Sequence, residues 1–129
     1  MSSSKIIKQM KDKEVEYLDL RFTDPRGKLQ HLTMDSKMVD EKMLNEGVFF
    51  DGSSIAGWKA INESDMILKP DLERQITDPF TSHNTLILFC DVLDAVKKNP
   101  YERDPRSIAK KAETYLKKTG IGDKAYFGP

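Results

Sequence analysis

The stretch VEYLDLRFTDPRGKLQHLTM, Val15 to Met34, has two apolar segments on either side of a turn. In the first segment Leu18 and Leu20 alternate with polar residues, which is the period of a strand with one buried face. In the turn TDPRGK, Pro25 presets the φ of the second turn position and Gly27 relaxes the far end. The sequence therefore predicts a β-hairpin here.

Short helices are expected on both sides of this hairpin. SSSKIIKQMKDKE, residues 2–14, begins with serines that can cap a helix and places Ile6 and Met10 at helical spacing. After the hairpin, residues 38–46 predict one or two helical turns, closed by Gly47 at the left-handed cap position.

Two further strands are expected in the middle of the chain. DMILKPD, residues 65–71, predicts a short strand that Pro70 stops, because proline cannot donate to a strand ladder. Residues 71–84 predict an irregular segment. TLILFCDV, residues 85–92, predicts a buried strand, since it is short and rich in β-branched and aromatic residues.

The segment RDPRSIAKKAETYLKKTG predicts a longer helix, with Asp104 as N-cap, Pro105 as first helical residue and Gly120 as terminator. Arg103 and Arg106 flank the cap. A direct ligand role for them is one interpretation, and solvated side chains beside a capped helix are the simpler one. The closing AYFGP looks like the start of another strand or turn, so we expect the chain to be cut at or just past a domain boundary.

Composition narrows the class of protein. The 129 residues suit one domain, or one domain with part of a second, and the 21 basic and 21 acidic residues give a net charge of zero. Such a balance argues against unspecific binding to nucleic acid or a membrane. No cationic, apolar leader and no apolar run near the roughly 20 residues that span a bilayer is seen, so we expect a cytosolic, globular protein.

Isolated residues and loose motifs offer little chemistry. Cys90 is the only cysteine and is expected to be a buried small hydrophobe. His31 and His83 lack the spacing of metal ligands. GIGDKA, residues 120–125, fits a loose dinucleotide-binding spacing, but it follows a helix and so predicts a cap and turn.

The loop FFDGSSIAGWKAINESD, residues 49–65, has neither helical nor strand periodicity and contains the only tryptophan. One interpretation is an Asx-turn whose serines satisfy local backbone groups, with Phe49, Phe50 and Trp58 filling the domain's own core. Against it stands the length of the loop, because irregular segments of this size are usually functional or disordered, and the aromatic content opposes disorder.

The alternative interpretation of the same loop is a binding site. If Asp51 and Ser54 project outward, they form a cluster of acceptors suited to a small cation or a polarised N–H group. The residues alone leave both interpretations open.

Several segments resemble one known family. FDGSS followed after eight residues by ESDMIL resembles the N-terminal signature of glutamine synthetase, the glutamate–ammonia ligase. RFTDPRGKLQH, INESDM, RDPRSIAKKAE and the closing FGP are similar, in the same order, to segments of the bacterial class I enzymes. The resemblance covers nearly the whole chain.

The resemblance implies an α+β fold, a β-grasp (ubiquitin-like roll) N-terminal domain at 1–102 followed at 103–129 by the first helix of a truncated catalytic domain. It also implies a homo-oligomer, a dodecamer of two stacked hexameric rings with active sites between neighbouring subunits. The substrates of the family are glutamate, ammonium and ATP, with Mg²⁺ or Mn²⁺. The family's metal, ATP and glutamate sites lie beyond Pro129, so no cofactor is expected to bind this chain, and the chain alone is expected to be inactive.

Site residues follow from the resemblance by position. Asp51 matches the aspartate that helps to bind ammonium and remove its proton, Ser54 matches the serine beside it, and Trp58 matches a tryptophan at the subunit contact. A carboxylate suits this task because it stabilises the cation and can then accept a proton. The competing hypothesis is a freestanding β-grasp module that binds a protein partner. A nucleic-acid binder is disfavoured by the zero net charge and the lack of an aromatic and basic stripe.

Overall fold

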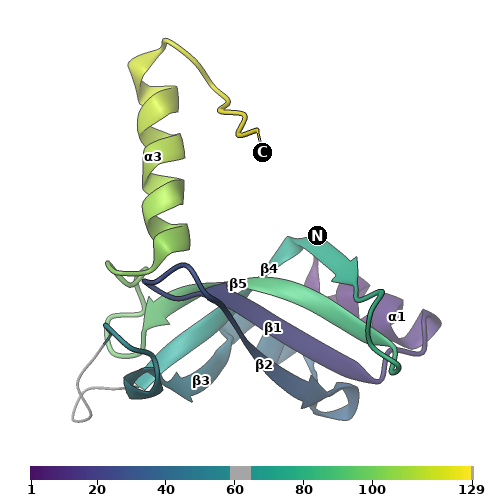
Figure 1. The fold of residues 1–129 in the computed structure, drawn as a ribbon. Coiled ribbons are helices and arrows are strands. Elements are labelled where there is room, and N and C mark those ends of the chain that lie inside the picture. Colours follow the sequence, from purple (N-terminus) through teal and green to yellow (C-terminus); the bar gives the residue numbers. More distant parts are fainter. Residues whose placement is uncertain (59–64, 129) are drawn as a thin grey trace.

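The computed structural model describes residues 1–58 and 65–128, and its centre is one mixed β-sheet (Figure 1). Among the described residues the strands are β1 (Tyr17–Thr23), β2 (Leu29–Asp35), β3 (Val48–Asp51), β4 (Asp65–Thr77) and β5 (Thr85–Asp94). The helices among them are α1 (Ser3–Asp12), α2 (Glu41–Glu46) and α3 (Pro105–Thr119), with short 3₁₀ turns at Ser36–Met38 and Gly52–Ser54. The hairpin, the strand beginning at Thr85 and all the expected helices are confirmed.

The strand order is β2-β1-β5-β4-β3. β1 and β5 lie parallel at the centre, and the other neighbours pair antiparallel. Parallel neighbours need a crossover, and here the chain between them forms β2, α2, β3 and β4 before it returns. β1 is the first of these strands in the sequence and β5 the last, and they lie side by side in the sheet. The DGSS turn directly follows the edge strand β3.

One face of the sheet forms the core. Leu18 pairs in register with Leu86, and Leu20 with Leu88, so that the alternate residues of both central strands face the same side. α1 and α2 cover this side, because Ile6 and Met10 of α1 and Leu44 of α2 are buried in the same core cluster. The buried cluster includes Ile6, Met10, Val15, Leu18, Leu20, Phe22, Leu44, Met66, Leu68, Leu86, Leu88, Cys90 and Val92. The expectation for Cys90 as a buried small hydrophobe is confirmed.

The strand at β4 is longer than expected. It continues through Pro70 to Thr77, so the expectation that Pro70 stops it and that residues 71–77 are irregular is wrong. β3 pairs with Asp65 to Leu68, so Pro70 lies where β4 is paired with β5 on one side, and its missing N–H costs little there. The register to β5 shifts between Pro70 and Gln75, which absorbs the irregular residues.

Gly47 ends α2 as expected and joins it to β3, but its φ of 91° and ψ of −177° do not give the left-handed helical cap that the sequence predicts. A Cβ at this position would lie 2.5 Å from the Leu68 carbonyl oxygen and from Cγ2 of Ile67. Glycine is therefore required twice, by the backbone conformation and by the close approach of β4.

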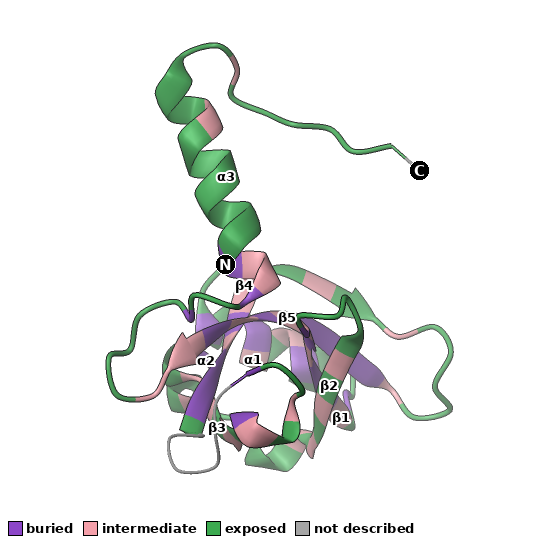
Figure 2. Cartoon of the chain, turned by 60° about the vertical axis from the view of Figure 1, so that its left-hand side comes forward, coloured by how far each residue is buried: buried purple, intermediate pink, exposed green. Residues whose placement is uncertain are grey.

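α3 projects from one end of the sheet and is exposed along most of its length (Figures 1 and 2). Asp104 is its N-cap, Pro105 begins it and Gly120 ends it, as the sequence predicts. Ser107, in its first turn, is buried against the sheet domain, while Ile108 and Tyr115 are exposed.

Candidate functional site

The DGSS turn is organised by the side chain of Asp51, the last residue of β3. Its Oδ1 accepts hydrogen bonds from the backbone N–H of Ser53 at 2.9 Å and from the Ser53 hydroxyl at 2.7 Å. The Ser54 hydroxyl donates to the Asp51 backbone carbonyl at 2.7 Å. The interpretation of this segment as an Asx-turn, with serines that satisfy local groups, is confirmed.

The same turn leaves chemistry at the surface. Asp51 and Ser54 are both exposed. Because the Ser54 hydroxyl donates its proton to the Asp51 carbonyl, the Ser54 oxygen can serve a further partner only as an acceptor. Asp65 lies directly opposite Asp51 in the β3–β4 register and is exposed too. Two carboxylates and a hydroxyl oxygen at one sheet edge favour a cation or an N–H donor over an anion.

Trp58 lies in an aromatic cluster of its own domain. Its ring stacks on Phe22 with centroids 5.7 Å apart, and it meets Phe50 and Tyr101 edge-on at 6.0 Å and 5.7 Å. The residue is 6% exposed. The expectation that Phe50 and Trp58 pack into the domain's own core is confirmed, whereas that for Phe49 is wrong: it is 64% exposed, because neighbouring residues of β3 face opposite sides of the sheet. The role of Trp58 at a subunit contact stays a prediction.

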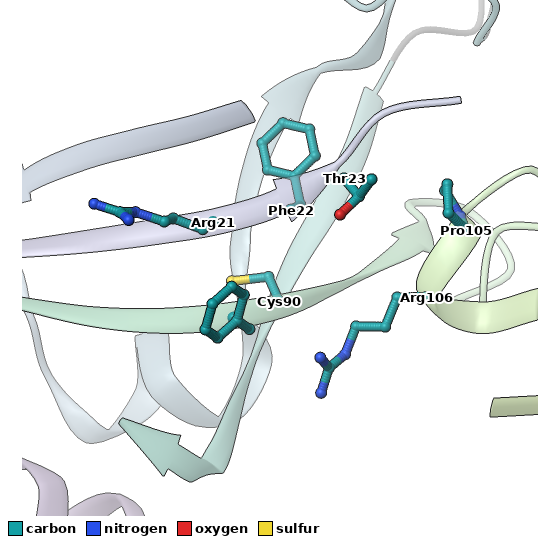
Figure 3. Close-up of a pocket in the computed structure, with 7 residues that line it drawn as sticks. Arg21, Phe22, Thr23, Cys90, Pro105 and Arg106 are labelled. Atoms are coloured by element: carbon teal, nitrogen blue, oxygen red, sulfur yellow. The ribbon is translucent and has the colours of Figure 1, made fainter. Parts of the chain in front are cut away.

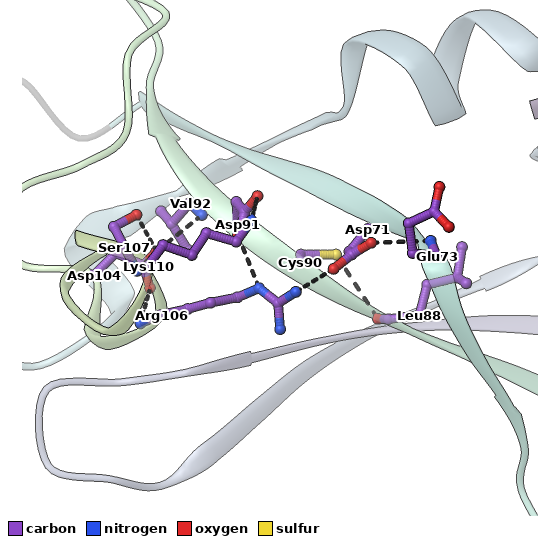
Figure 4. Close-up of polar contacts among 10 residues, drawn as sticks. All are labelled: Asp71, Glu73, Leu88, Cys90, Asp91, Val92, Asp104, Arg106, Ser107 and Lys110. Carbon is purple, nitrogen blue, oxygen red and sulfur yellow. Dashed lines mark hydrogen bonds and ion pairs between the residues drawn. The ribbon is translucent and has the colours of Figure 1, made fainter. Parts of the chain in front are cut away.

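The two arginines of RDPR have different environments. The simpler interpretation, a solvated side chain, is wrong for Arg106, which is half-buried and paired: its Nε donates to Asp91 at 2.8 Å and its Nη2 to Asp71 (Figure 4). Arg103 is exposed, and its Nη1 donates to the Gly57 carbonyl at 3.1 Å. None of these three partners could be found from the sequence, because they lie 15 to 46 positions away in the chain.

Asp104 anchors the start of α3. Its carboxylate accepts hydrogen bonds from the N–H and the hydroxyl of Ser107, at 3.0 Å and 2.7 Å, and from the N–H of Val92 at 3.4 Å (Figure 4). Asp104 is fully buried, and these donors compensate the burial of its charge. Lys110 adds an ion pair to Asp91 at 2.5 Å, one helical turn after Arg106. Together these contacts fix the direction in which α3 leaves β5.

A second polar network lies on β1 and β2. Asp19 is 3% exposed and accepts from Arg21 Nε at 2.7 Å, from the Thr33 hydroxyl at 2.7 Å and from His31 Nδ1 at 2.9 Å. Burial by itself raises the pKa of Asp19, but these hydrogen bonds outweigh it and hold that pKa below its usual value. Arg21 also pairs with Asp78 at 2.7 Å, which ties the chain after β4 to β1.

A small cavity of about 240 Å³ opens between β1, β5 and the start of α3 (Figure 3). It is lined by Arg21, Phe22, Thr23, Phe89, Cys90, Pro105 and Arg106. Both arginines are already paired with carboxylates, so the wall has no surplus positive charge for an anion. Burial raises the pKa of the Cys90 thiol, which keeps it protonated and a weak nucleophile. The cavity therefore carries no chemistry that we assign.

Within residues 1–58 and 65–128, histidine, cysteine and carboxylate side chains form no group of three or more that could hold a metal ion. Of the helices in the same part, none is both long and apolar enough to span a bilayer.

Comparison with known proteins connects the site to one family. Residues 14–95 match the family model described as the glutamine synthetase β-grasp domain. Curated relatives include glutamine synthetase of Rhizobium meliloti (strain 1021), 58% identical over 128 residues, 99% of this chain and 27% of the relative. Glutamine synthetase of Escherichia coli (strain K12) is 50% identical over all 129 residues, 28% of its length. The chain thus spans about a quarter of the curated relatives it matches.

The fold agrees with a solved structure of the same kind. The cryo-EM structure of Plasmodium falciparum glutamine synthetase superposes with a TM-score of 0.85 at 27% sequence identity, over 96% of this chain and 24% of that one. The mixed sheet with its helices on one face therefore matches the β-grasp architecture that the resemblance implied.

Proposed function

The chain belongs to the family of the glutamine synthetase β-grasp domain, and from this premise we propose that it is the N-terminal portion of a glutamate–ammonia ligase. The observation that carries the proposal is the DGSS turn. It presents Asp51 and Ser54 at the surface, held in place by hydrogen bonds within the turn.

In this proposal Asp51 and Ser54 form part of an ammonium site. The Asp51 carboxylate stabilises the cation by charge, and the Ser54 oxygen accepts one N–H and orients it. Ammonium has no lone pair, so a proton must leave before nitrogen attacks the γ-glutamyl phosphate. Asp51 accepts or relays that proton, nitrogen forms the new amide bond and phosphate leaves. Ser53 supports this step by fixing Oδ1 of Asp51.

We further propose that the DGSS turn serves the active site of a neighbouring subunit in a dodecamer of two hexameric rings. The exposed position of Asp51 and Ser54 at the edge of the sheet domain supports a role toward a second chain. We propose that Trp58 contributes to the same contact indirectly: its buried ring holds the loop that would touch the neighbouring subunit.

The remaining parts of the reaction are assigned to the rest of the parent protein. We propose that ATP, glutamate and Mg²⁺ or Mn²⁺ bind outside this chain, that the parent works in the cytosol, and that residues 1–102 form the β-grasp domain and 103–129 the start of the catalytic domain. Accordingly, the isolated chain is expected to show no ATP- and ammonium-dependent formation of glutamine. Turnover by the isolated chain would contradict this assignment.

The ammonium role is tested by Asp51→Ala in the full-length protein, with each substrate varied in turn. We expect the KM for ammonium to rise by about tenfold or more while the KM for ATP stays within about twofold. Asp12→Ala is the matched control, since Asp12 is an exposed carboxylate on α1, away from the turn. Equal losses for all three substrates in Asp51→Ala would instead indicate damaged folding or assembly.

A further inference from the structure

The short strap between β5 and α3, residues 101–104, is fixed to the sheet at both of its ends. The N–H of Tyr101 donates to the Val92 carbonyl at 2.9 Å, and the N–H of Asp104 donates to the Tyr101 carbonyl at 3.1 Å. The buried carboxylate of Asp104 accepts in turn from the Val92 N–H. A side chain on this strap therefore starts from a well-defined backbone position.

Two side chains of the strap reach the far end of the DGSS loop. The ring of Tyr101 contacts Trp58 edge-on, with centroids 5.7 Å apart. The guanidinium of Arg103 donates to the Gly57 carbonyl at 3.1 Å. Gly57 has a φ of 89°, which glycine adopts readily and residues with a side chain rarely do, and the hydrogen bond from Arg103 fixes its carbonyl at the surface.

Hydrogen bonds connect this far end back to Asp51. The backbone N–H of Trp58 donates to the Ile55 carbonyl at 3.2 Å, and the backbone N–H of Ile55 donates to the Gly52 carbonyl at 3.1 Å. The Ser54 hydroxyl then closes on the Asp51 carbonyl. The loop from Asp51 to Trp58 is thus a series of linked turns, fixed at one end by β3 and at the other by the strap.

We propose that Arg103 is a positioning residue for Asp51. It holds the Gly57 end of the loop through one hydrogen bond, so that the linked turns keep the Asp51 carboxylate and the Ser54 oxygen in one arrangement. Arg106 has a different task, because its ion pairs join α3 to the sheet and do not reach the loop. The inference rests on the proposed ammonium role of Asp51.

The test compares Arg103→Ala and Arg103→Lys in the full-length protein. With the bond to Gly57 removed, we expect the KM for ammonium to rise about 3- to 10-fold, the change that one lost hydrogen bond produces, while the KM values for ATP and glutamate stay within about twofold. Lysine can still donate to the carbonyl, so Arg103→Lys should recover at least half of the loss on a logarithmic scale. Arg74→Ala on β4 is the matched control, an exposed arginine remote from the loop.

Hydrogen exchange measured on the same proteins reports the loop itself. In Arg103→Ala the amides of residues 52–58 should exchange several times faster than in Arg74→Ala, with the amides of β5 unchanged. If exchange of the loop and the KM for ammonium both match the control, the positioning role is overturned.

Together, the Asp51→Ala and Arg103→Ala variants distinguish failure of this inference from failure of the proposed function on which it rests. A selective ammonium defect in Asp51→Ala without one in Arg103→Ala overturns the positioning role alone. If Asp51→Ala itself shows no selective ammonium defect, the proposed function fails, whatever the exchange of the loop shows.

Discussion

The indole ring of Trp58 stacks on the phenyl ring of Phe22, with centroids 5.7 Å and planes 28° apart. Phe22 belongs to β1 and Trp58 follows the DGSS turn, so this contact joins the candidate site to a central strand. The loop is therefore part of the domain's own core at Trp58, while Asp51 and Ser54, at the β3 end of the loop, are exposed.

Trp58→Ala should destabilise the domain by about 3 to 5 kcal/mol, because it removes a large ring that is buried among three other aromatic rings. Urea unfolding followed by far-UV circular dichroism would measure the loss. Trp58→Phe keeps an aromatic ring and should lose less than half as much. A loss in Trp58→Ala below about 1 kcal/mol would contradict the packing role.

The subunit role of Trp58 is a separate prediction. If the full-length protein is the dodecamer that we propose, sedimentation of Trp58→Ala should show partial loss of that assembly under conditions in which Trp58→Phe remains assembled. An intact dodecamer in Trp58→Ala would count against a contribution of this loop to the subunit contact.

Replacing Asp104 by Ala should lower the free energy of unfolding by about 2 to 3 kcal/mol. The change removes the cap of α3 and leaves the N–H groups of Ser107 and Val92 without their buried acceptor. Asp40→Ala is the comparison, because Asp40 caps the six-residue helix α2 from an exposed position and should cost only about 1 kcal/mol. Similar losses for both variants, by thermal or urea unfolding, would show that burial of Asp104 adds nothing.

The ion pairs of Arg106 should couple α3 to the sheet. A double-mutant cycle of Arg106→Ala with Asp71→Ala should give a coupling energy of about 0.5 to 1.5 kcal/mol, since both side chains are partly buried and their bonds are charge-assisted. The exposed i,i+4 pair Glu113–Lys117 within α3 should give only about 0.3 to 0.5 kcal/mol. Equal coupling in the two cycles would argue that Arg106 does not anchor the helix.

Stability should fall in acid partly through Asp19. The pKa of its carboxyl is lower in the folded chain than in the unfolded one, so its contribution is complete above the unfolded value near 3.9 and is lost as the pH falls toward the folded value. The difference in free energy of unfolding between the wild type and Asp19→Asn should therefore be constant from pH 7 to about 5 and shrink toward about pH 2. A difference that does not change over this range would contradict the assignment.

Local signals in the sequence were sufficient for much of the fold. The alternation of Leu18 and Leu20 with polar residues predicted β1, and the order Asp104, Pro105 and Gly120 predicted both ends of α3. These signals are local, because period and capping depend on neighbours in the chain.

Non-local relationships were beyond such signals. A proline such as Pro70 interrupts a strand when a neighbour pairs on each side of it. The sequence does not show that the pairing of β3 with β4 ends before Pro70. The partners of Arg103 and Arg106 depend on where the loop after β3 places Gly57, and on how β4 and β5 place Asp71 and Asp91 beside α3. For the same reason the pattern at residues 49–58 allowed a core loop or a binding site, and the structure shows a buried base with an exposed acidic turn.

The most direct measurement for the central claim is the steady-state kinetics of Asp51→Asn in the full-length protein. Asparagine keeps an oxygen that can accept from Ser53, so the turn is retained while the negative charge and the basic group are removed. We predict that kcat/KM for ammonium falls by about 10²-fold or more while the KM for ATP stays within about twofold. An Asp51→Asn protein that uses ammonium as well as the wild type does would contradict the account.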